Sequence, residues 1–315
     1  MLYAGVDIGG TNIKMGLVNS DGEIVVKSMF KTEAGIGGIE VVGEILKQLQ
    51  QLTDKLHIRM SDLGGIGIGI PGVADTENGI VVAAANVGWY DVPLAQEVTK
   101  RSGLRCVIGN DANCAALGEQ RFGGGKEYHD IVFITLGTGV GSGIILNNRI
   151  FAGMGSAGAE AGHMTLVYNG EMCNCGKRGC WERYASATAL IMQTNDAISR
   201  NPDSYLAVLA RKQGKVSGRT AFEAAEHGDR VAMQVVDQYI RYIAEGLISL
   251  GNILHPQAFV IGGGISHEGE HLMQPLREHL AAYINKSGFR PMIDVVQATL
   301  GNSAGTVGAA ALVME

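Results

Sequence analysis

The sequence has little basic charge, which limits the classes of partner. It holds 25 Lys and Arg against 31 Asp and Glu, a formal net charge of −6. Binding to nucleic-acid phosphates needs a basic patch, and none offsets this acidic excess. No apolar run approaches the roughly 20 residues that cross a bilayer, and the opening MLYAGVDIGG lacks the basic leader of a signal peptide. We therefore expect a cytoplasmic protein that binds neither nucleic acid nor membrane.

Cysteines are few and unevenly placed. There are five, and three of them fall between positions 173 and 180. An odd count with such a cluster fits a reducing compartment better than a secreted disulfide scaffold. We expect the other two, Cys106 and Cys114, to be plain buried thiols.

Linkers and low-complexity segments are also missing. The 315 residues are enough for two domains with their own cores. Without a Pro- or Ser-rich tether, a boundary near 112–130 is expected to be a hinge. Glycine, with 46 residues, is about twice as frequent as usual and clusters beside apolar runs. Such clusters indicate turns that approach a ligand closely.

The segment 160–182 concentrates metal-binding side chains. It offers the one nitrogen and three sulfurs of a closed tetrahedral zinc site, from His163, Cys173, Cys175 and Cys180. Gly176 and Gly179 allow the tight turns that bring sulfurs at this spacing together. Disulfides are the alternative, and a catalytic zinc would need an open position that four protein ligands do not leave. We predict a structural zinc loop, with Glu160 and Glu182 at its ends.

Hydrophobic periodicity predicts alternating strands and helices. Strands are expected at 2–8, 13–19, 23–29, 64–72, 104–109, 131–136, 142–147, 257–261 and 292–297. Helices are expected at 38–57, 93–102, 112–122, 181–199, 220–227, 229–254, 271–284 and 304–314. The alternation indicates an α/β fold, and hairpins at the glycine turns, together with the Asp21-Gly22 turn, require mixed sheets.

Two glycine hairpins are candidate phosphate cradles. VDIGGTNIKMGLVN (6–19) and ITLGTGVGSGIILN (134–147) share a strand, turn, strand plan at an offset of 128 residues, which indicates an internal duplication. Neither is a P-loop or a GxGxxG motif, because a strand follows where a helix should begin. Each alone is equally consistent with an ordinary tight hairpin. Asp7 ends an apolar strand, where a carboxylate needs a partner such as Mg²⁺ or the following turn.

Asn110 and Asp111 stand where a strand ends and a helix begins. Asp111 is a candidate helix N-cap. It is equally a candidate general base, because ligand clefts form at the carboxyl ends of α/β strands and a carboxylate there can take a proton from a substrate hydroxyl. The turn Gly262-Gly263-Gly264 follows another apolar strand and could place a flat nucleoside against the backbone, or could be a simple turn.

Together these motifs resemble the ROK family of bacterial sugar kinases and repressors, and within it the glucokinases. The resemblance covers nearly the whole chain in the family's order. It is carried by DIGGTNIK (7–14), IPG (70–72), GNDANCAALGE (109–119), LGTGVGSGI (136–144), EAGH (160–163), CNCGKRGCWE (173–182) and GGGIS (262–266).

The resemblance implies an actin-like ATPase (ribonuclease H-like) fold, with two domains and mixed sheets around a nucleotide cleft. The small domain would hold 1–112 plus 302–315, and the large one 113–301 with the zinc loop. It also implies a homodimer or homotetramer.

The resemblance implies transfer of phosphate from Mg²⁺-ATP to the 6-hydroxyl of glucose, with Asp111 as the base. The sugar would be held by Asn110, Asp111, Glu160, His163 and Glu182, joined by Asn86 and Gly72. ATP would lie against Asp7, Gly9, Gly10, Thr11, Asn12, Lys14, Gly137, Thr138, Gly139, Gly262, Gly263 and Gly264. Zinc would be bound by His163, Cys173, Cys175 and Cys180.

Other readings stay open at this point. The hexose could be N-acetylmannosamine, mannose, fructose or allose, because pocket dimensions are not written in the sequence. The phosphoryl donor could be polyphosphate. A sugar-responsive regulator of the same family would carry a DNA-binding domain before the first phosphate motif, and that motif here starts at Asp7. A sugar-binding protein without activity is the third alternative.

Overall fold

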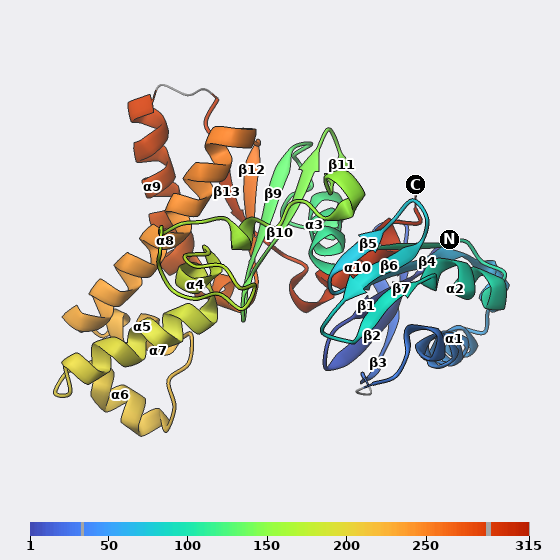
Figure 1. Cartoon of the computed structure of the whole chain (residues 1–315), viewed down its shortest axis with the longest axis horizontal. Helices are drawn as coiled ribbons and strands as arrows, with labels where there is room; N and C mark the ends of the chain where they lie inside the picture. Colours follow the sequence, from blue (N-terminus) through green and yellow to red (C-terminus); the bar gives the residue numbers. More distant parts are fainter. Residues whose placement is uncertain (33–34, 288–290, 315) are drawn as a thin grey trace. The chain divides into compact units, whose positions relative to one another are not determined.

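A computed structural model describes residues 1–32, 35–287 and 291–314 (Figure 1). The chain forms two compact units, of which unit 1 comprises Met1–His129, Gly143–Ala159 and Thr299–Glu315, and unit 2 comprises Asp130–Ser142 and Glu160–Ala298. The predicted division into 1–112 plus 302–315 and 113–301 stays a prediction. Within the described ranges, no helix is both long and apolar enough to cross a membrane.

The first sheet belongs to unit 1 and has the order β3-β2-β1-β4-β8. Its strands are β1 (Leu2–Ile8), β2 (Asn12–Asn19), β3 (Ile24–Lys31), β4 (Leu63–Ile70) and β8 (Cys106–Asn110). The first three pair antiparallel through the two predicted turns, whereas β4 and β8 run parallel to β1. The predicted mixed sheet is therefore confirmed.

Alternation along β1 gives the sheet two different faces. Ala4, Val6 and Ile8 are buried in one core with the apolar stripe of α1 (Gly38–Lys55) and with α2 (Leu94–Ser102). On the other face, a Cβ at Gly5 would lie 1.9 Å from the carbonyl oxygen of Thr306 in α10 (Ala304–Ala311). Glycine is needed here so that α10 can approach the sheet backbone.

Helix α3 (Asp111–Phe122) packs against α10 and carries a buried acid. The carboxylate of Glu119 is fully buried and accepts N–H groups from Gly124 (2.9 Å), Thr299 (2.9 Å) and Leu300 (2.8 Å). The Glu119 carboxylate thereby connects the segment that follows α3 to the segment that precedes α10. Cys114, on the same helix, is a buried free thiol as predicted. Burial raises its pKa well above the ordinary value.

The second sheet has the order β11-β10-β9-β12-β13. Its strands are β9 (Ile131–Leu136), β10 (Val140–Leu146), β11 (Arg149–Phe151), β12 (Ala258–Gly262) and β13 (Asp294–Gln297). β12 runs parallel to both β9 and β13. The helices of unit 2 are α4 (Glu182–Ala185), α5 (Ala187–Arg200), α6 (Tyr205–Gln213), α7 (Thr220–Glu226), α8 (Arg230–Leu254) and α9 (Glu270–Ser287).

Several elements differ from the sequence prediction, among them the short strand β11, which was not predicted. The helix expected at 181–199 is two helices, because Ser186 is extended and its side chain caps α5 by accepting from the Ala189 N–H at 3.1 Å. Helix α6 was not predicted. A third sheet of β5 (Val73–Asp75), β6 (Ile80–Ala84) and β7 (Trp89–Val92) was also not predicted, since its strands are short and partly polar.

Candidate functional site

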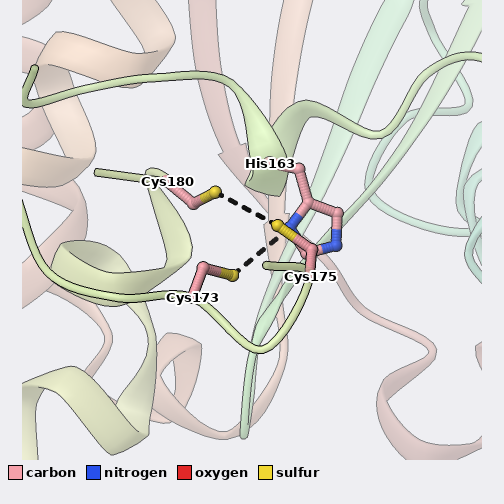
Figure 2. Close-up of side chains that lie close together, drawn as sticks. All are labelled: His163, Cys173, Cys175 and Cys180. Atoms are coloured by element: carbon pink, nitrogen blue, oxygen red, sulfur yellow. Dashed lines mark hydrogen bonds between the residues drawn. The ribbon is translucent and has the colours of Figure 1, made fainter. Parts of the chain in front are cut away.

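Four metal-binding side chains of unit 2 converge as the sequence predicted. One ligand atom from each of His163, Cys173, Cys175 and Cys180 lies within 4.8 Å of the others. Figure 2 shows the three sulfurs and the imidazole pointing toward one another, with His163 at the end of a short helical turn and the cysteines on a separate segment. All three thiols are free, so the disulfide alternative for these cysteines is wrong.

The spacing of these atoms fits zinc. A tetrahedral ion with Zn–S bonds of about 2.3 Å and a Zn–N bond of about 2.0 Å separates two sulfurs by about 3.8 Å, and a sulfur and a nitrogen by about 3.5 Å. The sulfurs of Cys175 and Cys180 are 3.6 Å apart, and Cys173 Sγ lies 3.7 Å from His163 Nδ1. Four protein ligands complete the coordination, so this is a candidate structural site with no open position.

Backbone turns and a buried indole hold the zinc loop. Gly176 and Gly179 both have positive φ, and a Cβ at Gly179 would lie 1.7 Å from the Val167 carbonyl oxygen. The predicted role of these glycines is confirmed. Trp181, next to the last ligand, is fully buried, and its Nε1–H donates to the Tyr242 carbonyl of α8 at 2.7 Å. The loop is therefore fixed to the body of unit 2.

The two carboxylates at the ends of the loop have different surroundings. Glu182 begins α4, and its Oε1 accepts from the Cys173 thiol at 2.9 Å and lies 3.7 Å from His163 Nδ1. Glu160 is exposed and precedes a short 3-10 helix, Ala161–His163, whose first N–H donates to Ser142 Oγ at 2.9 Å. The ring of His163 presents Nδ1 to the sulfurs, which leaves Nε2 on the opposite side of the ring.

The first glycine hairpin lies in unit 1, between β1 and β2. The Gly9 N–H donates to the Asn12 carbonyl at 3.0 Å, which closes the turn. Asp7 lies 3.8 Å from the ammonium of Lys14, and a Cβ at Gly305 would come within 2.8 Å of its carboxylate. Burial raises the pKa of Asp7, and Lys14 only partly offsets this. A partly buried carboxylate of this kind suits a cationic partner.

The second hairpin, between β9 and β10, belongs to unit 2. The Gly137 N–H donates to the Gly139 carbonyl at 3.0 Å. The Gly262–Gly264 turn follows β12, the neighbour of β9, and Gly263 has a φ of 84°. A Cβ at Gly263 would lie 2.5 Å from the backbone of Leu136, so this glycine brings the two turns together.

The strand end at β8 brings three predicted sugar-site residues together in unit 1. Asn110 is the N-cap of α3: its Oδ1 accepts from the N–H groups of Ala112 (2.9 Å) and Asn113 (3.1 Å). The N-cap alternative for Asp111 is therefore wrong, since Asp111 is the first helical residue. The Asn110 amide donates to the Gly72 carbonyl at 2.9 Å.

Gly72 and Asn86, both in unit 1, also have close neighbours. A Cβ at Gly72 would lie 2.2 Å from the Ala83 carbonyl oxygen, and its φ of 115° also requires glycine. A Cβ at Gly10, in the first hairpin, would lie 3.9 Å from the Asn86 Cβ, so Asn86 stands beside that hairpin.

The predicted residues thus fall into two groups. Unit 1 holds Asp7, Gly9, Gly10, Thr11, Asn12, Lys14, Gly72, Asn86, Asn110 and Asp111. Unit 2 holds Gly137, Thr138, Gly139, Glu160, His163, the three clustered cysteines, Glu182 and Gly262–Gly264. A large open cavity of about 1150 Å³ in unit 1, lined by Glu77, Lys100, Arg105 and Arg149 among others, contains none of them.

Sequence reasoning missed Ser186 and Thr188 at the start of α5, although both lie next to the predicted site. The Thr188 hydroxyl donates to the Thr138 carbonyl in the second hairpin at 2.8 Å. A serine followed by a helical pattern is a recognisable N-cap signal, and it could have placed the start of α5 here.

The duplicated glycine hairpins on two mixed sheets define an actin-like ATPase fold, as predicted. The profile of the ROK family matches residues 3–315, and the chain belongs to this family. The glucokinase of Halalkalibacterium halodurans is 38% identical over 319 residues, covering 99% of this chain and 95% of that one. The glucokinase of Thermotoga maritima is 38% identical over 312 residues, covering 99% and 96%. The crystal structure of a ROK family glucokinase from Streptomyces griseus in complex with glucose and AMPPNP superposes with a TM-score of 0.81 at 36% identity, covering 99% of both chains.

Proposed function

We propose that this protein transfers the γ-phosphoryl group of ATP to the 6-hydroxyl of glucose. The observation that carries the proposal is similarity to glucokinases at 36–38% identity over 99% of the chain, which includes a relative that holds glucose and an ATP analogue. Every residue predicted for the chemistry is present. Mg²⁺ bound with ATP would supply positive charge against the phosphates.

Asp111 is the proposed general base. It begins α3 directly after a strand, a position where ligands of α/β sheets bind. Its carboxylate would take the proton of the 6-hydroxyl as that oxygen attacks the γ-phosphate in line. The N–H groups of the two glycine hairpins would stabilise the phosphates, because consecutive backbone N–H groups bind anions.

Asn110, Glu160, His163 and Glu182 are the proposed partners of the sugar hydroxyls, together with Asn86 and Gly72. A carboxylate can accept from two hydroxyls at once. A site that hydrogen-bonds each hydroxyl rejects epimers, because a displaced hydroxyl leaves buried groups unpaired. His163 serves both sites in this proposal: Nδ1 faces zinc and Nε2 donates to a hydroxyl.

A panel of hexoses tests the substrate. Purified protein with Mg²⁺-ATP is assayed for ADP release on glucose, mannose, fructose, allose and N-acetylmannosamine. We expect the highest kcat/KM on glucose. A higher kcat/KM on another hexose reassigns the enzyme within its family, and no ADP release with any sugar refutes the kinase. Replacing ATP by polyphosphate in the same assay tests the donor.

We also propose a cytoplasmic homodimer or homotetramer, as the family resemblance implies. Light scattering of the purified protein at several concentrations decides between these states and a monomer.

A further inference from the structure

The second glycine hairpin is held by the first two residues of α5. The Ala187 N–H donates to the Gly137 carbonyl at 2.8 Å. The Thr188 hydroxyl donates to the next carbonyl, that of Thr138, also at 2.8 Å. Two consecutive carbonyls of the hairpin are therefore tied to one helix, which fixes the direction of its peptide planes.

The other side of this hairpin touches the zinc loop through Glu182. A Cβ at Gly139 would lie 2.6 Å from Glu182 Oε2, so the absent side chain makes room for that carboxylate. The second oxygen, Oε1, lies 2.9 Å from the sulfur of the zinc ligand Cys173. The segment Glu182–Thr188 thus contacts the zinc cluster at its first residue and the hairpin at both ends.

This segment is a firmly held corner. Ser186, between the two helices, is only 3% exposed, and its N–H donates to the Glu182 carbonyl at 3.2 Å. Ala185 is fully buried, and its carbonyl accepts the hydroxyl of Tyr239 in α8 at 2.8 Å. Because packed protein interiors deform very little, a displacement at the zinc end of this segment would be transmitted to the hairpin.

We propose that the segment Glu182–Thr188 positions the Gly137–Gly139 hairpin for the phosphates of ATP, with Thr188 as a positioning residue, and that the zinc cluster thereby sets nucleotide affinity. This inference rests on the proposed function, in which the hairpin binds ATP. It adds a role for zinc in binding the nucleotide to the proposed role in binding the sugar.

Thr188 can be tested with a shape-conserving substitution. Thr188→Val keeps the branched shape and removes the hydroxyl, whereas Thr188→Ser keeps the hydroxyl. Asn195→Ala, at an exposed position on the same helix, is the control for general effects on α5. The readouts are the Kd for AMPPNP by titration calorimetry, the KM for ATP and for glucose, and zinc content.

For Thr188→Val we expect AMPPNP Kd and ATP KM to rise about three- to tenfold, as one lost hydrogen bond implies, with glucose KM and zinc content unchanged. Thr188→Ser and Asn195→Ala are expected to stay within about twofold of the original chain. Unchanged AMPPNP affinity in Thr188→Val overturns the positioning role, as does equal weakening by Thr188→Ser.

The zinc arm uses the original chain before and after removal of zinc by a chelator, at a temperature where both remain folded by circular dichroism. We expect the zinc-free chain to bind AMPPNP at least about threefold more weakly, and equal affinity overturns the coupling. Calorimetry reads the nucleotide without turnover, so a chain that binds AMPPNP but phosphorylates no hexose refutes the proposed function and leaves this inference intact.

Discussion

The indole ring of Trp181 lies directly against the Cα of Gly246 in α8, where a Cβ would come within 2.0 Å of the ring. Trp181 stands between the zinc ligand Cys180 and Glu182 in the sequence. This contact therefore sets how closely the end of the zinc loop packs on the helix.

Alanine at two glycines of α8 should have different effects on stability. Each substitution gains about 1 kcal/mol of intrinsic helix propensity. At Gly246 this gain is opposed by an overpacking cost of about 1–3 kcal/mol against the buried Trp181 ring. At Gly251 the nearest atom to the new Cβ is the tip of Ile293 at 3.3 Å, which can shift, and the Phe259 ring lies at an ordinary contact distance of 3.9 Å. We expect Tm to fall for Gly246→Ala and to stay equal or rise for Gly251→Ala in thermal unfolding. A rise for both variants contradicts the close-packing account.

Substitution of Cys175 tests the zinc loop with little disturbance of core packing. It is the exposed member of the cluster, so Cys175→Ser removes a thiolate ligand without opening a buried cavity. We expect the original chain to copurify with about one zinc per chain and the variant with far less, because zinc prefers a thiolate to a hydroxyl. Glucose affinity should fall in parallel if the loop positions His163 and Glu182. Zinc content is measured by mass spectrometry and glucose binding by calorimetry; complete zinc loss with unchanged affinity rejects the coupling.

We expect the Asp7 carboxylate to lower the stability of the fold and to be needed for turnover. Burial raises its pKa in the folded state, so ionised Asp7 destabilises the fold at pH values above its ordinary pKa of 3.8. The penalty is absent below that pH and reaches its full size above the raised folded-state pKa. Asp7→Asn should therefore raise the Tm of the nucleotide-free protein at pH 7 and above, with a smaller gain as the pH falls toward 4. Turnover should drop at least about a hundredfold, because the proposed nucleotide site would lose a charge that faces the phosphates and Mg²⁺.

Thermal unfolding of the original chain and of Asp7→Asn between pH 4 and pH 8 gives the pH dependence of the difference in Tm. A lower Tm for Asp7→Asn than for the original chain at pH 7 would show that favourable interactions stabilise Asp7 in the absence of ligand. Asp21→Asn, in the exposed turn after β2, is the matched control and should change neither Tm nor turnover.

Local signals were sufficient for the hairpins and the zinc cluster. The glycine turns are flanked by continuous apolar runs, and four ligands within 18 residues of sequence, from His163 to Cys180, have few ways to converge. Both features depend on neighbouring residues, so their patterns survive in a single sequence. The strands of the third sheet are three to five residues long, which is too short for periodicity to distinguish them from loops.

Contacts between distant segments could not be predicted in the same way. Glu119 looks like an ordinary helical acid in the sequence, yet it is fully buried and binds the backbone at Thr299 and Leu300. Thr188 resembles any first-turn threonine, and its partner Thr138 lies 50 residues earlier. Their roles depend on which backbone groups the fold leaves unpaired, and a sequence pattern carries no record of these groups.

Asp111→Asn separates chemistry from binding more cleanly than any other substitution in the proposed site. The Asp111 Oδ1 accepts from the Ala112 N–H at 2.8 Å, and an asparagine oxygen can accept the same bond, so the first turn of α3 should be kept. The amide cannot take a proton from the 6-hydroxyl, and loss of a general base lowers kcat by about 10²–10⁴. We expect glucose affinity within several-fold of the original by calorimetry, with almost no ADP release in the coupled assay. Asp203→Asn, at an exposed position, controls for the loss of one charge. Normal turnover in Asp111→Asn would assign the proton to another acceptor.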